Sequence, residues 1–446
     1  MLTMQFGQCG NQLGHVLFSK ICSDIECINT GLPRNINYLY SEDSFNKWFN
    51  GISKDGKRLA RAIMIDTEQK VINRICNDTK MPWTYCTKNI ISQAGGGCGN
   101  NWANGYLIKG HEICDLVLNA VRQEIERIDH FDGFLMLLSS AGGTGSGIGS
   151  YITQLLHEEY NTKCMITTTI LPFPFGEVCT QNYNTLLTLA KLYNQTDMAV
   201  IFENEQIYSM CTNLLKNSHT SLQDINEIIS EKLMAVLQPT NNPNCNLNSL
   251  ISKVVSHPSY KLATIKSTPH VSTISSNYEP KYNWNSYVNH LKEIFRIPNA
   301  SSDLIDNETK MPSVLMKNTT HHVYTCSVAN VLITRGATKE SDFVITNELE
   351  GKNLYADWVT TDTFFHLHQN RKIFNRDKFL ALLTNNSQIT RPLNTLLNKT
   401  WNSYTHSAYL HQYKQFGLEE DDFLQAFATI ENTIKEYKDL IPHTSK

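Results

Sequence analysis

Residues 134–156 read FLMLLSSAGGTGSGIGSYITQLL, and five glycines fall within the eight residues 142–149. An apolar run typical of a buried strand precedes the glycines, and an apolar stripe with helical spacing follows them. Glycine loses more conformational freedom on folding than any other residue, so this density indicates that something must approach the main chain closely. A glycine loop that opens a helix presents free N–H groups and the positive end of the helix dipole. It therefore predicts a phosphate-binding site.

Neither of two common phosphate-binding motifs fits this loop. A P-loop needs a Lys-Ser/Thr pair after its second glycine, and no lysine lies within residues 128–162. The dinucleotide fingerprint G-x-G-x-x-G fails in both frames, because Ile148 or Ser150 stands where the third glycine belongs. The charge of a phosphate would therefore be met by backbone amides, by the Thr144 and Ser146 hydroxyls and by a metal ion. The alternative is a tight turn between strand and helix that binds nothing.

The composition describes an ordinary globular protein. The chain has 446 residues, enough for two or three domains, with 41% hydrophobic and 18% charged residues. A net charge of −3 gives no reason to expect nucleic acid or an anionic membrane as a partner. The N-terminus does not resemble a secretory signal, and no apolar run approaches the length of a membrane span. The 12 cysteines show neither C-x-x-C nor zinc spacing, which favours reduced thiols in the cytosol over disulfides.

The first half of the chain alternates short apolar runs with helical patterns, as a doubly wound sheet does. Strands are expected at Leu2–Phe6, Ala62–Ile65, Phe134–Leu138, Met165–Leu171 and Met198–Phe202. Helices are expected at Gln8–Ile21, His111–Arg127, Gly147–Tyr160 and Gln181–Leu192.

The second half reads as a mixed α/β segment followed by helices. Ser221 is a good N-cap for a helix that runs to about Leu237, and residues 238–278 read as irregular structure mixed with strands. Two strands and two final helices are then expected, at Val323–Thr334, Phe379–Thr384, Leu393–Tyr413 and Glu420–Tyr437. The acidic run 419–422 suits the first turn of the last helix.

Five motifs accompany one another along the chain: GQCGNQLG at 7–14, Asp66-Thr67-Glu68, GNNWANGY at 99–106, AGGTGSG at 141–147 and FENEQIY at 202–208. Together they resemble the tubulin superfamily over nearly the whole chain. The segments VVSHPSYK at 254–261 and AYLHQYKQFGLEEDDF at 408–423 resemble the delta class of that family rather than the alpha, beta or gamma class. The same holds for SSAGGTGSG, where Ala141 replaces the usual first glycine.

The resemblance implies a binding site for GTP or GDP with Mg²⁺. Positions that contact the nucleotide phosphates match Gln8, Cys9, Asn100, Ser139, Ala141, Gly142, Gly143, Thr144, Gly145, Ser146 and Gly147. Glu68 matches the acid that helps hold Mg²⁺ through water, with Asp66 beside it. Positions near the base and the ribose match Gln12, Glu177, Gln181, Asn204, Leu222 and Asn226. Asn204 and Asn226 suit the guanine edge, since an amide both donates and accepts hydrogen bonds.

Each of these residues, taken singly, suits a turn, a buried position or a solvated surface equally well. Their joint agreement with one site favours binding. A side chain at Gly143 is expected to fill the space that a phosphate needs.

Besides Ala141, three positions depart from the family pattern. Leu222 stands where many tubulins place an aromatic ring over guanine, so the stacking contribution is lost and weaker binding is expected. Gln181 stands where an acid is common. Ser249 lies nearest the acid that alpha-tubulin donates to its neighbour's nucleotide, and no Asp or Glu occurs between Glu231 and Glu279. A serine cannot serve as a general base near neutral pH without help, so at most a weak, assembly-linked GTPase is expected.

The fold implied by the resemblance is a tubulin-like α/β architecture. Residues 1–205 would form a doubly wound GTP-binding domain with a mostly parallel sheet. Residues 206–380 would form the core helix and an intermediate α/β domain, and residues 381–446 a C-terminal helical domain. The sequence ends at DLIPHTSK without the long acidic tail of alpha- and beta-tubulin, so proteins that grip such tails are expected to find little to hold.

The implied function is that of a structural GTP-binding protein of the cytoskeleton. It would act in assembly or maintenance of the triplet microtubules of centrioles and basal bodies, at the base of a cilium or flagellum. Its partners would be alpha- and beta-tubulin, with epsilon-tubulin as a further candidate, and centriolar proteins. The alternative is a non-polymerising, nucleotide-dependent adaptor that recruits other tubulins or centriolar proteins. A general polymer-forming GTPase fits less well, because the loop around Ser249 lacks the activating acid.

Overall fold

The structure is a computed structural model whose described residues cover most of the chain. It describes residues 1–440 except Asn29, Thr79, 93–95, Phe175, Glu177, 216–218, 243–244, 271–282, 297–324, 338–348, 352–353 and 360–362. Glu177, the first residues of the strand expected at Val323–Thr334 and the terminal segment after Leu440 therefore lie outside the described residues.

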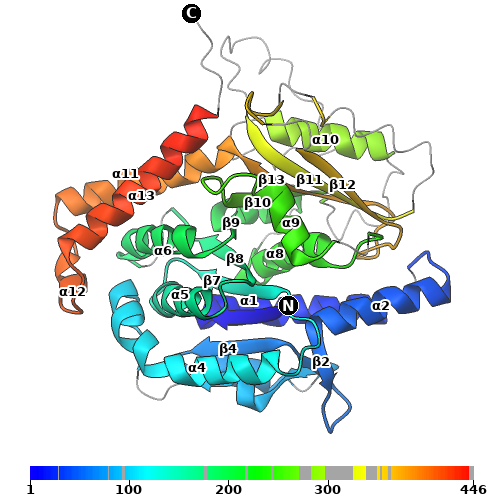
Figure 1. Cartoon of the computed structure of the whole chain (residues 1–446), viewed down its shortest axis with the longest axis horizontal. Helices are drawn as coiled ribbons and strands as arrows, with labels where there is room; N and C mark the ends of the chain where they lie inside the picture. The colour runs from blue at the N-terminus through cyan, green and yellow to red at the C-terminus, as the bar shows by residue number, and fades with distance from the viewer. Residues whose placement is uncertain are drawn as a thin grey trace, which may run out of the picture.

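Six parallel strands form the first part of the main sheet (Figure 1). Their order is β6-β4-β1-β7-β8-β9, with bounds Ile90–Ser92, Ala62–Asp66, Leu2–Phe6, Gly133–Ser139, Cys164–Leu171 and Met198–Glu203. The five strands expected in this half are all present, each within one residue of its predicted bounds. The prediction succeeded because central parallel strands are apolar on both faces.

Four further strands extend the same sheet into the second half of the chain. Strand β10 (Leu262–Thr268) pairs in parallel with β9, and its other edge pairs antiparallel with β13 (Phe379–Asn386). Strands β11 (Ser327–Arg335) and β12 (Phe364–Gln369) complete a ten-stranded sheet. A separate small sheet contains β2 (Phe49–Ile52), β3 (Arg58–Ala60) and β5 (Trp83–Tyr85).

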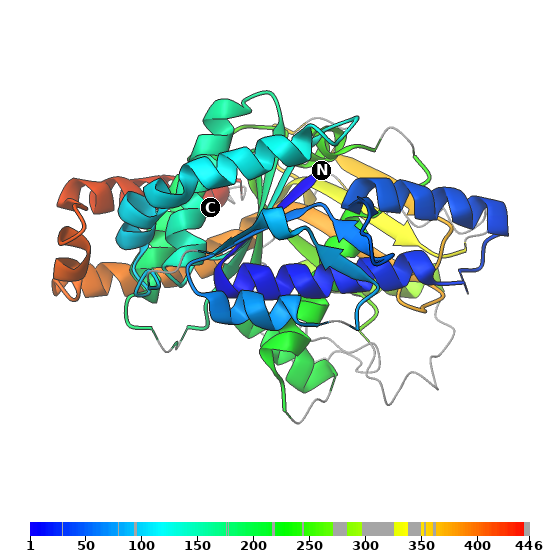
Figure 2. The same cartoon turned by 90° about the horizontal axis from the view of Figure 1, so that it is seen from below.

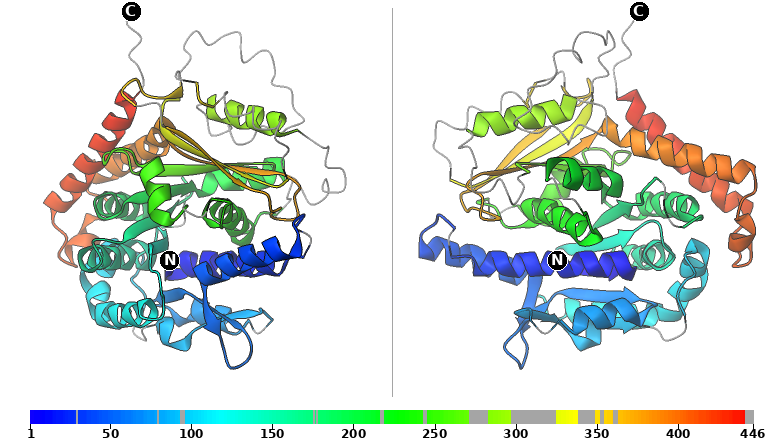
Figure 3. Two further views of the ribbon diagram at one scale, coloured as in Figure 1. Left: turned by 45° about the vertical axis from the view of Figure 1, so that its right-hand side comes forward. Right: turned by 180° about the vertical axis from the view of Figure 1, so that it is seen from behind.

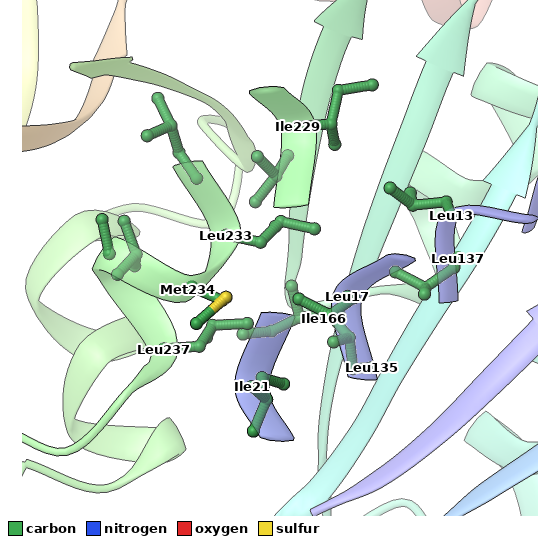
Figure 4. Packing of buried hydrophobic residues seen from close by; sticks show 14 of the residues in the cluster. Leu13, Leu17, Ile21, Leu135, Leu137, Ile166, Ile229, Leu233, Met234 and Leu237 are labelled. Atoms are coloured by element: carbon green, nitrogen blue, oxygen red, sulfur yellow. The ribbon is translucent and has the colours of Figure 1, made fainter. Parts of the chain in front are cut away.

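Helices cover both faces of the parallel strands (Figures 1 and 3). On one face, α1 (Gly7–Glu26) and α8 (Leu222–Leu237) pack against alternate residues of the strands. Figure 4 shows this contact, where Leu13, Leu17 and Ile21 of α1 meet Leu135 and Leu137 of β7, Ile166 of β8, and Ile229, Leu233, Met234 and Leu237 of α8. On the other face, α4 (Gly110–Ile125) and α5 (Gly149–Glu159) pack against Phe134, Met136 and Leu138. Helices α1 and α8 thus share one face of the sheet.

A helical layer formed by α6 (Gln181–Gln195), α11 (Thr390–Thr405) and α13 (Glu420–Asp439) lies at one side of the molecule (Figure 2). The acidic run begins α13 as expected, and Glu419 and Asp422 form a reciprocal cap. The single helix expected at Leu393–Tyr413 is wrong. Helix α11 ends at Thr405 and α12 begins at Leu410, because Ser407 and Tyr409 adopt left-handed backbone angles between them.

Several helices were not predicted from the sequence. They are α2 (Arg34–Trp48), α3 (Gln69–Cys76), α7 (Asn204–Ser209), α9 (Leu247–Val254) and α10 (Trp284–Arg296). Strand β10 agrees with the irregular structure mixed with strands that was expected for residues 238–278, whereas helix α9 was not expected there. Residues 243–244 and 271–278 lie outside the described residues. No helix in the described part of the chain is long and apolar enough to cross a membrane.

Candidate functional site

A cleft of about 290 Å³ lies at the carboxyl ends of the parallel strands. Strands β1, β4, β7 and β9 end at Phe6, Asp66, Ser139 and Glu203, and because they are parallel these ends share one edge of the sheet. Ligands of open α/β sheets bind at this edge. The cleft is lined by Phe6, Gly7, Gln8, Cys9, Gln12, Asp66, Glu68, Val71, Asn100, Ser139, Gly142, Gly143, Thr144, Gly145, Asn204, Leu222, Ile225 and Asn226.

The glycine loop follows β7, and its later residues belong to a π-helical turn, Thr144–Ile148, that leads into α5. Its glycines serve two purposes: Gly142 leaves space open, and Gly143 and Gly147 allow close packing against a neighbouring segment. A Cβ added at Gly142 would meet only the Asn100 side-chain oxygen, at 3.9 Å, so this position is open. A Cβ at Gly143 would lie 2.6 Å from the Cys98 Cβ, and one at Gly147 would lie 2.4 Å from the Trp102 carbonyl oxygen. The expectation that a side chain at Gly143 would fill phosphate space is therefore wrong, because Gly143 faces the neighbouring loop.

Gly7 provides a second close approach at the mouth of the cleft. It has a left-handed φ of 66° between β1 and α1, and a Cβ there would lie 3.0 Å from the Gly145 backbone nitrogen. An L side chain at Gly7 would be strained and would also press on the glycine loop. The turn before α1 and the glycine loop are thus in direct contact, which brings Gln8 and Cys9 to the same cleft. Burial raises the pKa of the Cys9 thiol to about 12, so this cysteine is neutral.

Asn184 of α6 hydrogen-bonds to two loops of the cleft, the glycine loop at Ala141 and the loop at Asn100. Its side-chain nitrogen donates to the Ala141 carbonyl oxygen at 2.7 Å and to the Asn100 carbonyl oxygen at 2.8 Å. Asn184 is fully buried, and its side-chain oxygen accepts from the Trp102 N–H and from the Tyr413 hydroxyl. Sequence reasoning missed this residue. It lies on a buried polar stripe of α6 with Gln181, Thr185 and Thr188, and that stripe is its one signal in the sequence.

Asp66 and Glu68 form the acidic end of the cleft. Asp66 Oδ1 accepts the Glu68 N–H at 3.1 Å, while the buried Oδ2 has no hydrogen-bond partner among the described residues. Burial is the main cause that raises the pKa of Asp66 to about 6, and the charge of Glu68 adds to the effect. A cation bound here would stabilise the charged form of Asp66, which burial and the charge of Glu68 both disfavour. The described residues contain no group of three or more His, Cys, Asp or Glu placed to hold a metal ion, so phosphate oxygens and water would supply the other ligands, as Mg²⁺ prefers.

The far end of the cleft is formed by the starts of α7 and α8. Asn204 is the first residue of α7, directly after β9, and Asn226 lies one turn into α8. A reciprocal cap between Ser221 and Asp224 fixes the start of α8 as the sequence predicted. Leu222 follows this cap and is 55% exposed, so its side chain forms an apolar edge that a planar base could cover. Val71 and Ile225, both missed from the sequence, add apolar lining.

Four residues expected at the site do not line the cleft. Ala141 and Gly147 contribute backbone to the loop, and the Ser146 hydroxyl is buried and donates to the Gly142 carbonyl oxygen. Gln181 is buried at the start of α6, where its side-chain nitrogen donates to the Phe173 carbonyl oxygen at 2.9 Å. These residues support the loops, and Thr67 does the same through a 2.9 Å hydrogen bond to Thr144.

Helix α9 carries Ser249, away from the cleft of its own chain. Leu247, Leu250, Ile251 and Val254 bury one face of this helix, and Asn246 caps it by accepting the Ser249 N–H at 2.8 Å. Asn248 and Ser252 are exposed and Ser249 is half-buried. The outward face of α9 is therefore polar and carries no carboxylate.

Comparison with known proteins gives one consistent result. The sequence model of the Tubulin/FtsZ family, GTPase domain, matches residues 1–212. The chain is 33% identical to the tubulin delta chain of Homo sapiens, over 99% of this chain and all of that protein. It is 27% identical to the tubulin gamma chain of Saccharomyces cerevisiae and 25% identical to the tubulin beta-8 chain of Oryza sativa, over 98% of this chain in both cases and 92% and 94% of those proteins.

Proposed function

This chain belongs to the tubulin family, and from that premise we propose that it acts in assembly or maintenance of the triplet microtubules of centrioles and basal bodies. The family establishes guanine nucleotide binding and a cytoskeletal role with other tubulins. The observation that carries the finer proposal is full-length similarity to delta chains, which exceeds the similarity to the gamma and beta chains. The proposed location is the base of a cilium or flagellum.

Nucleotide binding in the cleft follows from the same lining residues. The phosphates would meet the backbone of residues 142–145, the Thr144 hydroxyl, and the turn with Gln8 and Cys9. Asp66 and Glu68 would hold Mg²⁺, which supplies positive charge opposite the phosphates in place of a P-loop lysine. Asn204 and Asn226 would read the guanine edge, with Gln12 and Leu222 beside the base and ribose.

The chain itself would do little to hydrolyse the nucleotide. In tubulin stacking, an acid from one subunit reaches the nucleotide of the next. Helix α9 offers only amide and hydroxyl groups at its exposed positions. The protein would therefore keep its nucleotide mainly as part of its structure. The missing acid counts against a general polymer-forming GTPase. The second candidate is a nucleotide-dependent adaptor that recruits other tubulins or centriolar proteins without polymerising.

The three-part division at residues 205 and 380 is retained as part of this proposal. The boundary at 205 follows the end of β9, where the parallel strands of the first part finish. The boundary at 380 cuts through a strand, because β13 runs from Phe379 to Asn386.

Microscopy of the tagged protein at its native expression level tests the function directly. Label on the walls of basal-body triplets, with loss of the outer tubules when the protein is depleted, is the expected result. Label beside the basal body with intact triplets after depletion would favour the adaptor. Label along ordinary cytoplasmic microtubules, with none at basal bodies, would overturn both proposals.

A further inference from the structure

Helix α12 (Leu410–Lys414) connects α11 to α13 at one end of the helical layer (Figure 1). Although it is remote in sequence, it hydrogen-bonds to segments that support the cleft. The Tyr413 hydroxyl donates to the Asn184 side-chain oxygen at 2.7 Å, and the Gln412 carbonyl oxygen accepts from the Asn101 side-chain nitrogen at 2.9 Å. The C-terminal helices are therefore joined to α6 and to the loop that contains Asn101.

The side chain of Asn184 has no spare hydrogen-bonding capacity. Its nitrogen donates to the Ala141 and Asn100 carbonyl oxygens, and its oxygen accepts from the Trp102 N–H and the Tyr413 hydroxyl. An amide has two donor hydrogens and two acceptor lone pairs, so every position is used. Burial raises the pKa of Tyr413, so its hydroxyl keeps the proton that it donates. Removal of this donor would leave one acceptor position of a fully buried amide empty.

Asn100 is the cleft residue that this network holds in place. It lines the cleft with a left-handed φ of 52°, which few residues other than glycine adopt. Its carbonyl oxygen accepts from Asn184 and, at 3.0 Å, from the Thr180 hydroxyl. Both partners also contact Tyr413, since its hydroxyl lies 3.3 Å from the Thr180 carbonyl oxygen. These hydrogen bonds fix the position of the Asn100 peptide.

The loop at Asn100 lies at the acidic end of the cleft. A Cβ added at Gly97 would lie 2.7 Å from Glu68 Oε1, and the open position at Gly142 faces the Asn100 side-chain oxygen. Residues 97–100 therefore lie beside Glu68 and opposite the glycine loop. Because Mg²⁺ binds the outermost phosphates of a nucleoside triphosphate, the terminal phosphate of GTP would lie nearest this loop. GDP lacks that phosphate and would depend less on the loop.

We propose that Tyr413 is a positioning residue that acts through Asn184 on the loop at Asn100, so that the C-terminal helices help the cleft to distinguish GTP from GDP. The proposal rests on the nucleotide binding proposed above. The hydroxyl does not touch the nucleotide. Together with the Trp102 N–H, it keeps the Asn184 amide in the orientation that directs its nitrogen at both carbonyl oxygens. The reversed amide would place an oxygen against those two acceptors.

Tyr413→Phe tests the proposal, because it removes the hydroxyl and leaves a ring to pack against Tyr183 and Phe423. GTP affinity should fall about fivefold while GDP affinity changes by less than about twofold. Competition with a fluorescent GDP analogue, on the full-length protein with Mg²⁺ present, measures both affinities. Thr180→Val removes the other hydrogen bond to the Asn100 carbonyl oxygen and should shift the ratio of the two affinities in the same direction. It carries the test if the Tyr413→Phe protein fails to fold.

Tyr183→Phe is the matched control. Tyr183 is as buried as Tyr413, and its ring centroid lies 5.6 Å from the Tyr413 ring centroid. The Tyr183 hydroxyl has no hydrogen-bond partner among the described residues, so its loss should leave the ratio of GTP to GDP affinity unchanged.

Two results would overturn the proposal, and they differ in what else they exclude. If Tyr413→Phe keeps the wild-type ratio, whether both affinities fall equally or neither changes, Tyr413 serves stability alone, and nucleotide binding by the cleft still stands. If the wild type binds neither nucleotide saturably, nucleotide binding itself is wrong and the role of Tyr413 falls with it.

Discussion

The cleft at the strand ends and helix α9 differ in the side chains that they present. The cleft brings together the glycine loop, the Asp66–Glu68 pair and the two asparagines at the ends of parallel strands. Helix α9 keeps a buried apolar face that fixes its position but presents no carboxylate outward. The buried face of α9 is therefore apolar and well packed, while its exposed positions carry only amide and hydroxyl groups. If the proposed site is right, nucleotide binding and nucleotide turnover would rest on separate surfaces of this chain, so each could be altered alone.

The largest effect should come from restoring a carboxylate on α9. The purified wild-type protein should bind GTP yet hydrolyse it very slowly, with little acceleration as its concentration rises. Ser249→Glu should accelerate hydrolysis if two copies stack head to tail, because general-base assistance contributes about 10²–10⁴-fold. Phosphate release at several protein concentrations measures the effect.

The matched control for this variant is Ser249→Gln, which has the same length but no charge. It should behave as the wild type does. Strong, concentration-dependent GTPase activity of the wild type would contradict the comparison, because it would mean that another group on the stacking face activates water.

Gly142 and Gly143 are neighbours, but a side chain at Gly142 would enter open space whereas one at Gly143 would press on packed residues. Gly142→Val projects into open space beside Asn100 and should weaken GTP binding about a hundredfold while the protein keeps its melting temperature. Gly143→Val meets Cys98 and Asn101 and should cost about 1–3 kcal/mol of folding free energy by overpacking. Nucleotide affinity and thermal unfolding of both variants measure the contrast. Equal loss of stability in the two proteins would show that Gly142 also packs against the chain.

The glycine loop shows how far sequence reasoning reaches. The strand before it and the helix after it follow from apolar patterning, because both are continuous in sequence. The reason for each glycine depends on what lies opposite, and for Gly143 and Gly147 that is the segment from Cys98 to Gly105, about forty residues away. Asn184 was missed for the same reason, since its partners Ala141 and Asn100 are remote in sequence.

Short helices and breaks between helices were also missed from the sequence. Helix α9 spans eight residues in a segment rich in Asn and Ser, where local propensity favours turns, and its four buried residues are what stabilise it. The break after α11 contains neither glycine nor proline, so nothing in the sequence indicated that Ser407 and Tyr409 take left-handed angles. Tertiary contacts decide both cases.

The cleft and helix α9 should respond differently to loss of an amide. Asn204→Ala should weaken guanine preference by about 1–3 kcal/mol, or roughly ten- to a hundredfold, because a base-edge hydrogen-bond pair is lost. Affinities for GTP and ATP, measured side by side, report the preference. Asn248→Ala, at an exposed amide on α9, is the control and should change neither affinity. An equal loss for GTP and ATP would show that Asn204 does not read the base.

The smallest expected effect concerns Leu222, the position at the base end where an aromatic ring is common in the family. Leu222→Phe should tighten GTP binding about two- to tenfold, because an aromatic pair contributes roughly 0.5–1.5 kcal/mol beyond the area it buries. The side chain is 55% exposed at the start of α8, directly after the Ser221 cap, so a larger ring can be accommodated without overpacking. ATP binding should tighten by a similar factor, because stacking does not depend on the hydrogen-bonding edge. Leu424→Phe, at an exposed leucine on α13, should leave both affinities unchanged. Unchanged GTP affinity in Leu222→Phe, in a protein with a normal melting temperature, would mean that the base lies away from α8 and that Asn226 must be reconsidered with it.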